Sequence, residues 1–356
     1  MKAFLILEDG TVFTGTSIGS TKSVISEIVF NTSMTGYLEV LTDPSYAGQA
    51  VVMTYPLIGN YGITPDMESK QPWPDGYIVR ELSRIPSNFR CQGTIQDFLK
   101  EHDIPGIAGI DTRALTKILR EKGTMNGMIT TDENYKLDEI LPQLHVYNTG
   151  NVVDKVTCSE KEVLKADGYK VALLDFGAKN NIAQSLHKRG CEVTIYPAHT
   201  TAEEILASNP DGIMLSNGPG DPKACTDIIK EVKKLYDSEV PIFAICLGHQ
   251  LMALATGADT YKLKYGHRGG NHPVKDLETG RVYISSQNHG YAVDAESLDL
   301  TVAVPAFTNV NDGTNEGLKY TGKNIFTVQF HPEACPGPQD SGYLFDKFIE
   351  MMGGQK

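Results

Sequence analysis

The residues best suited to chemistry lie where apolar runs end in tight turns. VPIFAICLGHQLMALATG, residues 240–257, is an apolar run that delivers Cys246 into a glycine turn. With Ala244 as the small residue before it, this order is typical of a nucleophile elbow between a strand and a helix. A helix start favours a thiolate, and the N–H of Leu247 is placed to meet an oxyanion. A buried core cysteine fits the same residues equally well.

A cysteine nucleophile needs a base, and the base needs an orienting group. The stretch NIFTVQFHPE supplies both. Residues 325–330 predict a strand, and His331 and Glu333, two apart, share one face of extended chain. Pro332 between them marks the strand end. His331 is predicted to take the thiol proton and Glu333 to hold the imidazole. A turn at the end of a strand, with His331 and Glu333 in solvent, is the alternative.

A third stretch, LSNGPGDP, runs from a predicted strand into a glycine turn. Gly218 and Gly220 allow a ligand to approach the backbone closely, and free N–H groups there would complete an oxyanion hole with Leu247. A plain turn between a strand and a helix fits equally well. No lysine follows in the spacing of a phosphate-binding loop.

Histidines near Cys246 raise the question of a metal site. Cys246 and His249 have C-x-x-H spacing, and His267 and His272 follow. No second pair at ligand spacing follows, and an elbow cysteine points away from its own helix. We therefore expect no metal.

The elements that must position these residues alternate regularly after residue 170. Four apolar strands alternate with four amphipathic helices, one of which begins with a capping box at Thr200 and Glu203. This pattern predicts an α/β domain over residues 170–356, with a mostly parallel sheet that carries sites at the carboxyl ends of its strands.

The first half of the chain has a different pattern. Short β-rich runs and turns predict a smaller α+β domain over residues 1–150, with a hairpin at Asp9-Gly10. A helix is predicted between Asp111 as its N-cap and Gly123. The polar, charged residues 151–169 predict a linker.

Composition excludes several classes of protein. The 356 residues hold 44 acidic and 32 basic side chains, a formal net charge of −12, which argues against a nucleic-acid or anionic-membrane surface. No run of about 18 apolar residues and no secretory leader is evident. The six cysteines form no C-x-x-C pair, so free thiols in the cytoplasm are expected.

Taken together, SNGPGDP, AICLGHQ and QFHPE resemble the class I glutamine amidotransferases, over residues 170–352. Further motifs, most of them in the first half of the chain, point to one family within this class. NTSMTGYLEVLTDPSYAGQAVVMTYPLIGNYG, GIDTRALTKILREKGTMNGMI and VALLDFGAKNNI are similar to the small (glutaminase) subunits of glutamine-dependent carbamoyl phosphate synthetase.

The resemblance implies a glutaminase with Cys246 as nucleophile and His331 and Glu333 completing a triad. It implies glutamine contacts at eight positions: Ser45, Gly218, Gly220, Leu247, Gln250, Asn288, Gly290 and Tyr291. Ser45, in TDPSYAGQ, implies that the first domain closes over the active site; an ordinary turn is the alternative.

The resemblance further implies a large-subunit partner that makes carbamoyl phosphate from bicarbonate and carries ATP and Mg, with no cofactor on this chain. Whether the product serves arginine or pyrimidine synthesis stays open. Three positions depart from the family pattern: Ala244 replaces a glycine, Cys335 a serine and Gln339 a histidine.

Two other functions fit the same motifs. One is a non-catalytic binding module on the same fold, against which the intact triad speaks. The other is a cysteine peptidase, although Ser45 and SNGPGDP suit a small amide better than a peptide.

Overall fold

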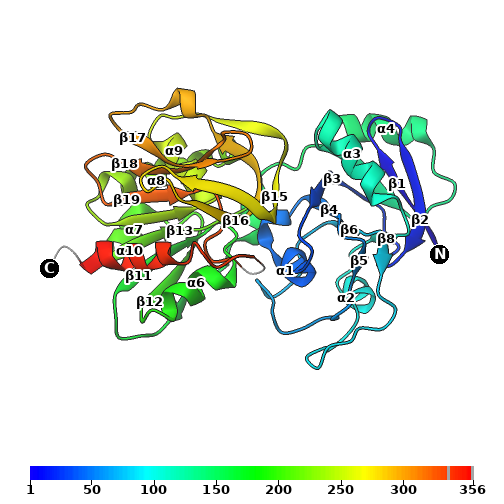
Figure 1. The fold of residues 1–356 in the computed structure, drawn as a ribbon, viewed down its shortest axis with the longest axis horizontal. Coiled ribbons are helices and arrows are strands. Elements are labelled where there is room, and N and C mark those ends of the chain that lie inside the picture. Colours follow the sequence, from blue (N-terminus) through cyan, green and yellow to red (C-terminus); the bar gives the residue numbers. More distant parts are fainter. Residues whose placement is uncertain (335–336, 354–356) are drawn as a thin grey trace. The chain divides into compact units, whose positions relative to one another are not determined.

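The chain consists of two compact units, Met1–Thr149 and the residues from Gly150 on. The computed structural model describes residues 1–334 and 337–353 (Figure 1). Within those ranges, no helix combines the length and the apolar character that crossing a membrane requires. Each unit has a sheet of its own, and the residues singled out for chemistry, Ser45 apart, lie in the second.

The first unit is built on a closed barrel with helices around it. Around the barrel, the strands run in the order β1 (Lys2–Leu7), β2 (Val12–Ser17), β8 (Gly106–Ala108), β6 (Gly76–Ile78), β4 (Gln49–Met53), β3 (Val24–Asn31) and β9 (Met125–Thr130). The helical segments are α1 (Tyr37–Thr42), η1 (Pro44–Tyr46), α2 (Ile95–Glu101), α3 (Thr112–Lys122) and α4 (Leu137–Val146), and β5 (Leu57–Ile58) pairs separately with β7 (Glu81–Leu82).

Two local features of this unit, a hairpin turn and a helix cap, are formed as predicted. Ile6 pairs with Val12 across the Asp9-Gly10 turn, which confirms the hairpin. The Asp111 side chain accepts a hydrogen bond from the Ala114 N–H at the start of α3 and so caps that helix. Closure of the barrel depends instead on pairing between β1 and β9, which lie far apart in the sequence.

The second unit contains one sheet of ten strands, mostly parallel in its first half. Its order is β10 (Glu162–Leu164), β12 (Glu192–Pro197), β11 (Lys170–Asp175), β13 (Gly212–Leu215), β14 (Ile242–Ile245), β19 (Ile325–Val328), β18 (Asn315–Tyr320), β17 (Ala303–Asn309), β15 (Thr260–Asp276) and β16 (Val282–Val293). The five strands from β12 to β19 are parallel, as expected. The strands from β18 to β16 are antiparallel.

Helices cover both faces of the parallel strands, because alternate strand residues enter two separate cores. Leu215 and Ala244 belong to the core under α7 (Ala202–Ala207), α8 (Thr226–Asp237) and α9 (Leu247–Ala255). Met214 and Phe243 belong to the core under α6 (Asn180–His187) and α10 (Tyr343–Gly353). Both cores exclude water, which explains why these strands read as continuous apolar runs.

Two details differ from the sequence-based expectation. Residues 151–169 contain a helical turn, α5 (Val153–Val156), and the edge strand β10, which pairs antiparallel with β12. Edge strands accept charged residues, so polarity alone does not mark a linker. The cap of α7 is Thr201, one residue after the predicted Thr200, and its hydroxyl accepts from the Glu204 N–H.

Helix α9 lies unusually close to β13, because Gly248 has no side chain. A Cβ on Gly248 would lie 2.6 Å from the carbonyl oxygen of Leu215 and 2.7 Å from its Cβ. We therefore expect Gly248→Ala to lower the free energy of unfolding of the second unit by about 1–3 kcal/mol, measured by denaturant unfolding. Gly93→Ala is the control, since no atom would lie within 4 Å of its added Cβ. An unchanged Gly248→Ala protein would contradict the close packing.

Candidate active site

Cys246 occupies the predicted elbow between β14 and α9. Its backbone has φ 53° and ψ −105°, a rarely populated conformation that costs on the order of 1–3 kcal/mol. Its N–H donates to the Val328 carbonyl at 2.8 Å, which ties the elbow to β19. Leu247 begins α9, so its N–H has no partner within the helix. The elbow thus holds a thiol and an N–H donor at the carboxyl end of a central strand.

His331 and Glu333 follow β19, which pairs directly with β14. Glu333 Oε1 lies 2.6 Å from His331 Nδ1, and both side chains are fully buried. The other ring nitrogen, Nε2, is buried without a hydrogen-bond partner. The Cys246 thiol acts on this imidazole, although its own hydrogen bond goes to the Asn288 carbonyl, 3.7 Å away. The structure therefore brings the three predicted triad residues together.

Electrostatics favour the charged forms of both His331 and Glu333. Burial and Lys179 act to lower the His331 pKa, but Glu333 and the Cys246 thiol outweigh them and raise it to about 9. Burial alone would raise the Glu333 pKa, whereas His331 and Lys179 bring it down to about 2. The pair is therefore an imidazolium and a carboxylate at neutral pH, the partner state that a Cys246 thiolate requires.

Lys179 is a member of this site that the sequence analysis missed. Its Nζ lies 3.3 Å from Glu333 Oε1, and its side chain is almost fully buried. It immediately precedes α6, after β11, so it lies at the same edge of the sheet as Cys246. The signal was present in DFGAKNNI, where a lysine follows a buried parallel strand, but a lone lysine at a helix start is not distinctive.

Several predicted glutamine contacts lie around Cys246. The Asn288 carbonyl accepts the thiol hydrogen bond. Gln250, on α9, donates from Nε2 to the Tyr291 carbonyl at 2.8 Å and to Gln329 Oε1 at 2.9 Å. Asn288 and Tyr291 are both on β16, so α9 and the elbow contact one short segment of that strand. Their role in binding glutamine stays a prediction.

The predicted glycines lie at close backbone approaches. A Cβ on Gly218 would lie 2.2 Å from the Phe176 carbonyl oxygen and 2.7 Å from Leu247 Cδ2, so Gly218 packs against the first residue of α9. Gly220 has φ +92°, which favours glycine. Gly290 lies on β16.

Ser45 belongs to the first unit, where it lies in η1 and its N–H donates to Asp43 Oδ1 at 2.9 Å. The contact of Ser45 with glutamine stays a prediction. Cys335 lies outside the described residues.

The histidines weighed as metal ligands have other neighbours. His249 is buried, with Nδ1 2.7 Å from the Thr327 hydroxyl, and burial lowers its pKa to about 3. His267 lies within ion-pair distance of two carboxylates, Asp312 and Glu316. His289 and Glu316 complete a buried cluster with His267 that spacing in the sequence did not reveal.

Comparison with known proteins matches both halves of the chain. Residues 172–351 match the family model for glutamine amidotransferase class-I, and residues 5–129 match the model for the carbamoyl-phosphate synthase small chain, CPSase domain. The carbamoyl phosphate synthase small chain of Clostridium perfringens (strain 13 / Type A) is 53% identical over 353 residues, covering 98% of this chain and 99% of that one.

Two further relatives are similar along their whole length. The small chain of Listeria monocytogenes serotype 4b (strain F2365) is 52% identical and covers 100% of this chain and 98% of its own. That of Fusobacterium nucleatum subsp. nucleatum is 51% identical and covers 97% of each.

Proposed function

Since the chain belongs to the carbamoyl phosphate synthase small-chain family, with a class I glutamine amidotransferase domain, we propose that it hydrolyses the side-chain amide of L-glutamine. The products are glutamate and ammonia, and the ammonia passes to a large subunit that makes carbamoyl phosphate from bicarbonate and ATP. One observation carries this function: the strained Cys246 elbow lies beside a buried His331–Glu333 pair.

The chemistry begins with attack of the Cys246 thiolate on the glutamine carboxamide carbon. The carbon–sulfur bond forms, and the negative charge develops on the amide oxygen. The Leu247 N–H, at the start of α9, stabilises this oxyanion together with backbone N–H groups near Gly218, which packs against Leu247. The helix start adds its partial positive charge at the same place.

Collapse of this intermediate breaks the carbon–nitrogen bond. His331 donates its proton to the departing nitrogen, which leaves as ammonia, and the γ-glutamyl group remains on sulfur as a thioester. The neutral His331 then takes a proton from water, whose oxygen attacks the thioester. Glutamate leaves and the thiolate–imidazolium pair is restored. Glu333 holds the ring through Nδ1, and Lys179 holds the carboxylate.

The partner is inferred from the division of labour in the family. The name small chain in the relatives implies a larger companion, and we place ATP, Mg and the bicarbonate chemistry on that large subunit, with no cofactor on this chain. Glutamine contacts are assigned to the eight residues predicted from the resemblance, and the complex is expected to be cytoplasmic.

A glutamine-mimicking electrophile tests the nucleophile directly. We expect a diazoketone analogue of glutamine to alkylate Cys246, because that thiol lies beside the His331 imidazolium. Cys158, Cys191 and Cys225 should react much more slowly, since burial raises the pKa of each, to about 11 or 12. Peptide mapping after partial labelling gives the site.

Excess L-glutamine is the control, because it should protect Cys246 and leave any unspecific alkylation unchanged. An adduct on another cysteine, Cys335 included, would overturn the assignment of the nucleophile. Labelling of Cys246 without release of ammonia from glutamine would instead favour the non-catalytic binding module.

A further inference from the structure

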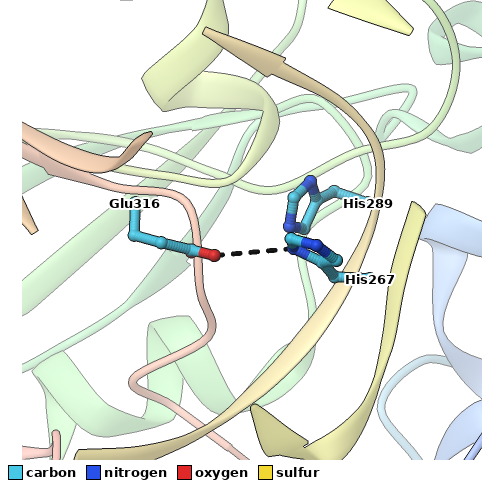
Figure 2. A group of neighbouring side chains, drawn as sticks. All are labelled: His267, His289 and Glu316. Atoms are coloured by element: carbon cyan, nitrogen blue, oxygen red, sulfur yellow. Dashed lines mark ion pairs between the residues drawn. The ribbon is translucent and has the colours of Figure 1, made fainter. Parts of the chain in front are cut away.

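A second group of buried titratable side chains lies in the antiparallel half of the sheet. Figure 2 shows its centre: His267 on β15, His289 on β16 and Glu316 on β18. All three are buried, and their ligand-type atoms lie within 4.8 Å of one another. The proposed mechanism uses none of them.

His267 lies between two carboxylates. Its Nε2 is 2.9 Å from Asp312 Oδ2, and its Nδ1 is 3.5 Å from Glu316 Oε1. A neutral imidazole has one N–H, so only the imidazolium presents a proton to both oxygens. Burial acts to lower the His267 pKa, but the two carboxylates outweigh it and raise the pKa to about 9.

The other charged and titratable groups around His267 do not supply the positive charge between the two carboxylates in its place. His272, whose ring centre is 5.1 Å away, has its pKa lowered to about 4 by burial and by His267. Burial and His267 likewise lower the His289 pKa. Arg268, the next residue on β15, donates from Nη1 to the Tyr265 carbonyl. His267 is therefore the protonated histidine of the group.

Glu316 connects this cation to neighbouring strands. Its Oε1 accepts hydrogen bonds from Gln287 Nε2 on β16 and from Asn309 Nδ2 on β17, both at 2.9 Å. Glu316 is fully buried, so its charge relies on these donors and on His267. A carboxylate only accepts, and it therefore fixes the Gln287 amide with the NH₂ group toward itself.

The Gln287 amide carries the connection to the candidate active site. Its Oε1 is 3.1 Å from His289 Nε2, and His289 Nδ1 is 2.8 Å from the Tyr291 carbonyl oxygen. Both oxygens accept, so the neutral His289 donates its one proton to one of them and packs against the other. That carbonyl also accepts from Gln250, and the carbonyl of Asn288 accepts from the Cys246 thiol. The segment 287–291 is thus held on one side by the Glu316 network and on the other by α9 and the elbow.

We infer that Glu316 and His267 are positioning residues for glutamine: their ion pair fixes residues 287–291 of β16, which carry the predicted contacts Asn288, Gly290 and Tyr291. This inference rests on the proposed function. It assigns a role in substrate binding to residues that touch neither the substrate nor the reacting atoms.

A metal ion is the alternative occupant of such a group. Two histidines and a glutamate resemble a zinc ligand set, and Asp312 would serve as the outer partner of His267. Coordination would require the His267 proton to leave from between two carboxylates. The ion pairs therefore favour a proton over a metal, and metal binding is an outcome that the experiment must detect.

The test is Glu316→Gln in the complex with the large subunit. The amide keeps the size of the carboxylate but removes its charge, so the ion pair with His267 is lost and the Gln287 hydrogen bond that holds β16 is no longer made to a charged acceptor. We expect the KM for glutamine to rise about tenfold at pH 8, the change that corresponds to 1.4 kcal/mol, while kcat changes less than about threefold. Synthesis from ammonium chloride should be unchanged.

The pH dependence supplies a readout that loss of packing would not move. The His267 pKa of about 9 lies above its usual 6.5, so the ion pair persists at neutral pH and is lost as the pH rises through about 9. The His331 pKa is also about 9, so the rise of the KM near pH 9 in the wild type is the reference against which the variants are compared. In Glu316→Gln this rise should move down by about one pH unit or more, because one of two opposite charges is gone.

Asp312→Asn is the second variant, more exposed and less demanding on folding, and should move the rise in the same direction. Glu278→Gln is the matched control, since Glu278 pairs with Lys319 at 3.9 Å with both side chains largely exposed. It should leave the KM and its pH dependence unchanged.

Histidine NMR titration of the same proteins separates this inference from the proposed function. His267 should titrate near pH 9 in the wild type and lower in Glu316→Gln, whatever the enzyme does with glutamine. Normal glutamine kinetics in both Glu316→Gln and Asp312→Asn would overturn the positioning role. So would stoichiometric Zn²⁺ binding that Glu316→Gln abolishes. A wild-type complex that titrates as expected but consumes no glutamine would refute the proposed function instead.

Discussion

Cys246→Ser is expected to abolish carbamoyl phosphate synthesis from glutamine while synthesis from ammonium chloride continues at close to the wild-type rate. A serine hydroxyl has nearly the shape of the thiol but a far higher pKa, so His331 in a site tuned for thiolate does not activate it. The thioester does not form, and glutamine hydrolysis should fall by about 10⁴-fold or more, as for loss of a nucleophile elsewhere. The assay is product formation from each nitrogen source at saturating ATP and bicarbonate.

Glutamine should still bind to the variant, because its assigned contacts come from side chains such as Gln250 and from the backbone. Cys91→Ser is the matched control: that cysteine is partly exposed, and its thiol donates to the Gly93 carbonyl within the first unit. Substantial glutamine-dependent synthesis by Cys246→Ser would show that Cys246 is not the nucleophile. A well-assembled wild-type complex that cannot use ammonium chloride would refute the division of labour between the subunits.

Glu333→Gln is expected to lower kcat for glutamine hydrolysis by about 10²–10⁴-fold, as when the acid of a related triad becomes an amide. The amide no longer stabilises the imidazolium at 2.6 Å, and the His331 pKa should fall because burial and Lys179 then act unopposed by a charge. Single-turnover hydrolysis at saturating glutamine measures the loss.

Lys179 allows folding and catalysis to be separated in this variant. Glu333→Gln leaves a buried ammonium without its carboxylate, which should cost about 3–5 kcal/mol of stability. Adding Lys179→Met removes that unpaired charge, so the double variant should regain much of the stability but not the activity. Glu296→Gln, at an exposed position, is the control. Activity restored by the double variant would mean that Glu333 only supports the fold.

The candidate triad was predictable because its members follow strands whose apolar runs are plain in the sequence. Buried parallel strands end at one edge of a sheet, which places Cys246 and His331 along that edge. The resemblance implied that they act together, and the direct pairing of β14 with β19 makes them neighbours. The elbow added a local signal, the glycine after the thiol, and the structure explains it by the contact between Gly248 and Leu215.

Features that depend on distant pairing were not predictable in this way. Barrel closure joins residues far apart, and β10 adds to the sheet from a stretch too polar to read as a strand. Lys179 becomes informative only when β11 is placed in the sheet. The ion pair of His267 and Glu316 requires the antiparallel order of β15 to β18, in which no local motif specifies the neighbours.

The place of β19 in the sheet has a consequence for the protein during its synthesis. Although β14 pairs with β19, the two are separated by the whole antiparallel half of the sheet, and His331 and Glu333 follow β19 near the end of the chain. On the ribosome, Cys246 therefore emerges long before its base. A nascent chain that ends before β19 has Cys246 without its base and without the Val328 carbonyl that holds the elbow, so glutaminase activity requires the last parallel strand to insert between β14 and β18. Ammonia release is thereby withheld until the second unit is nearly complete.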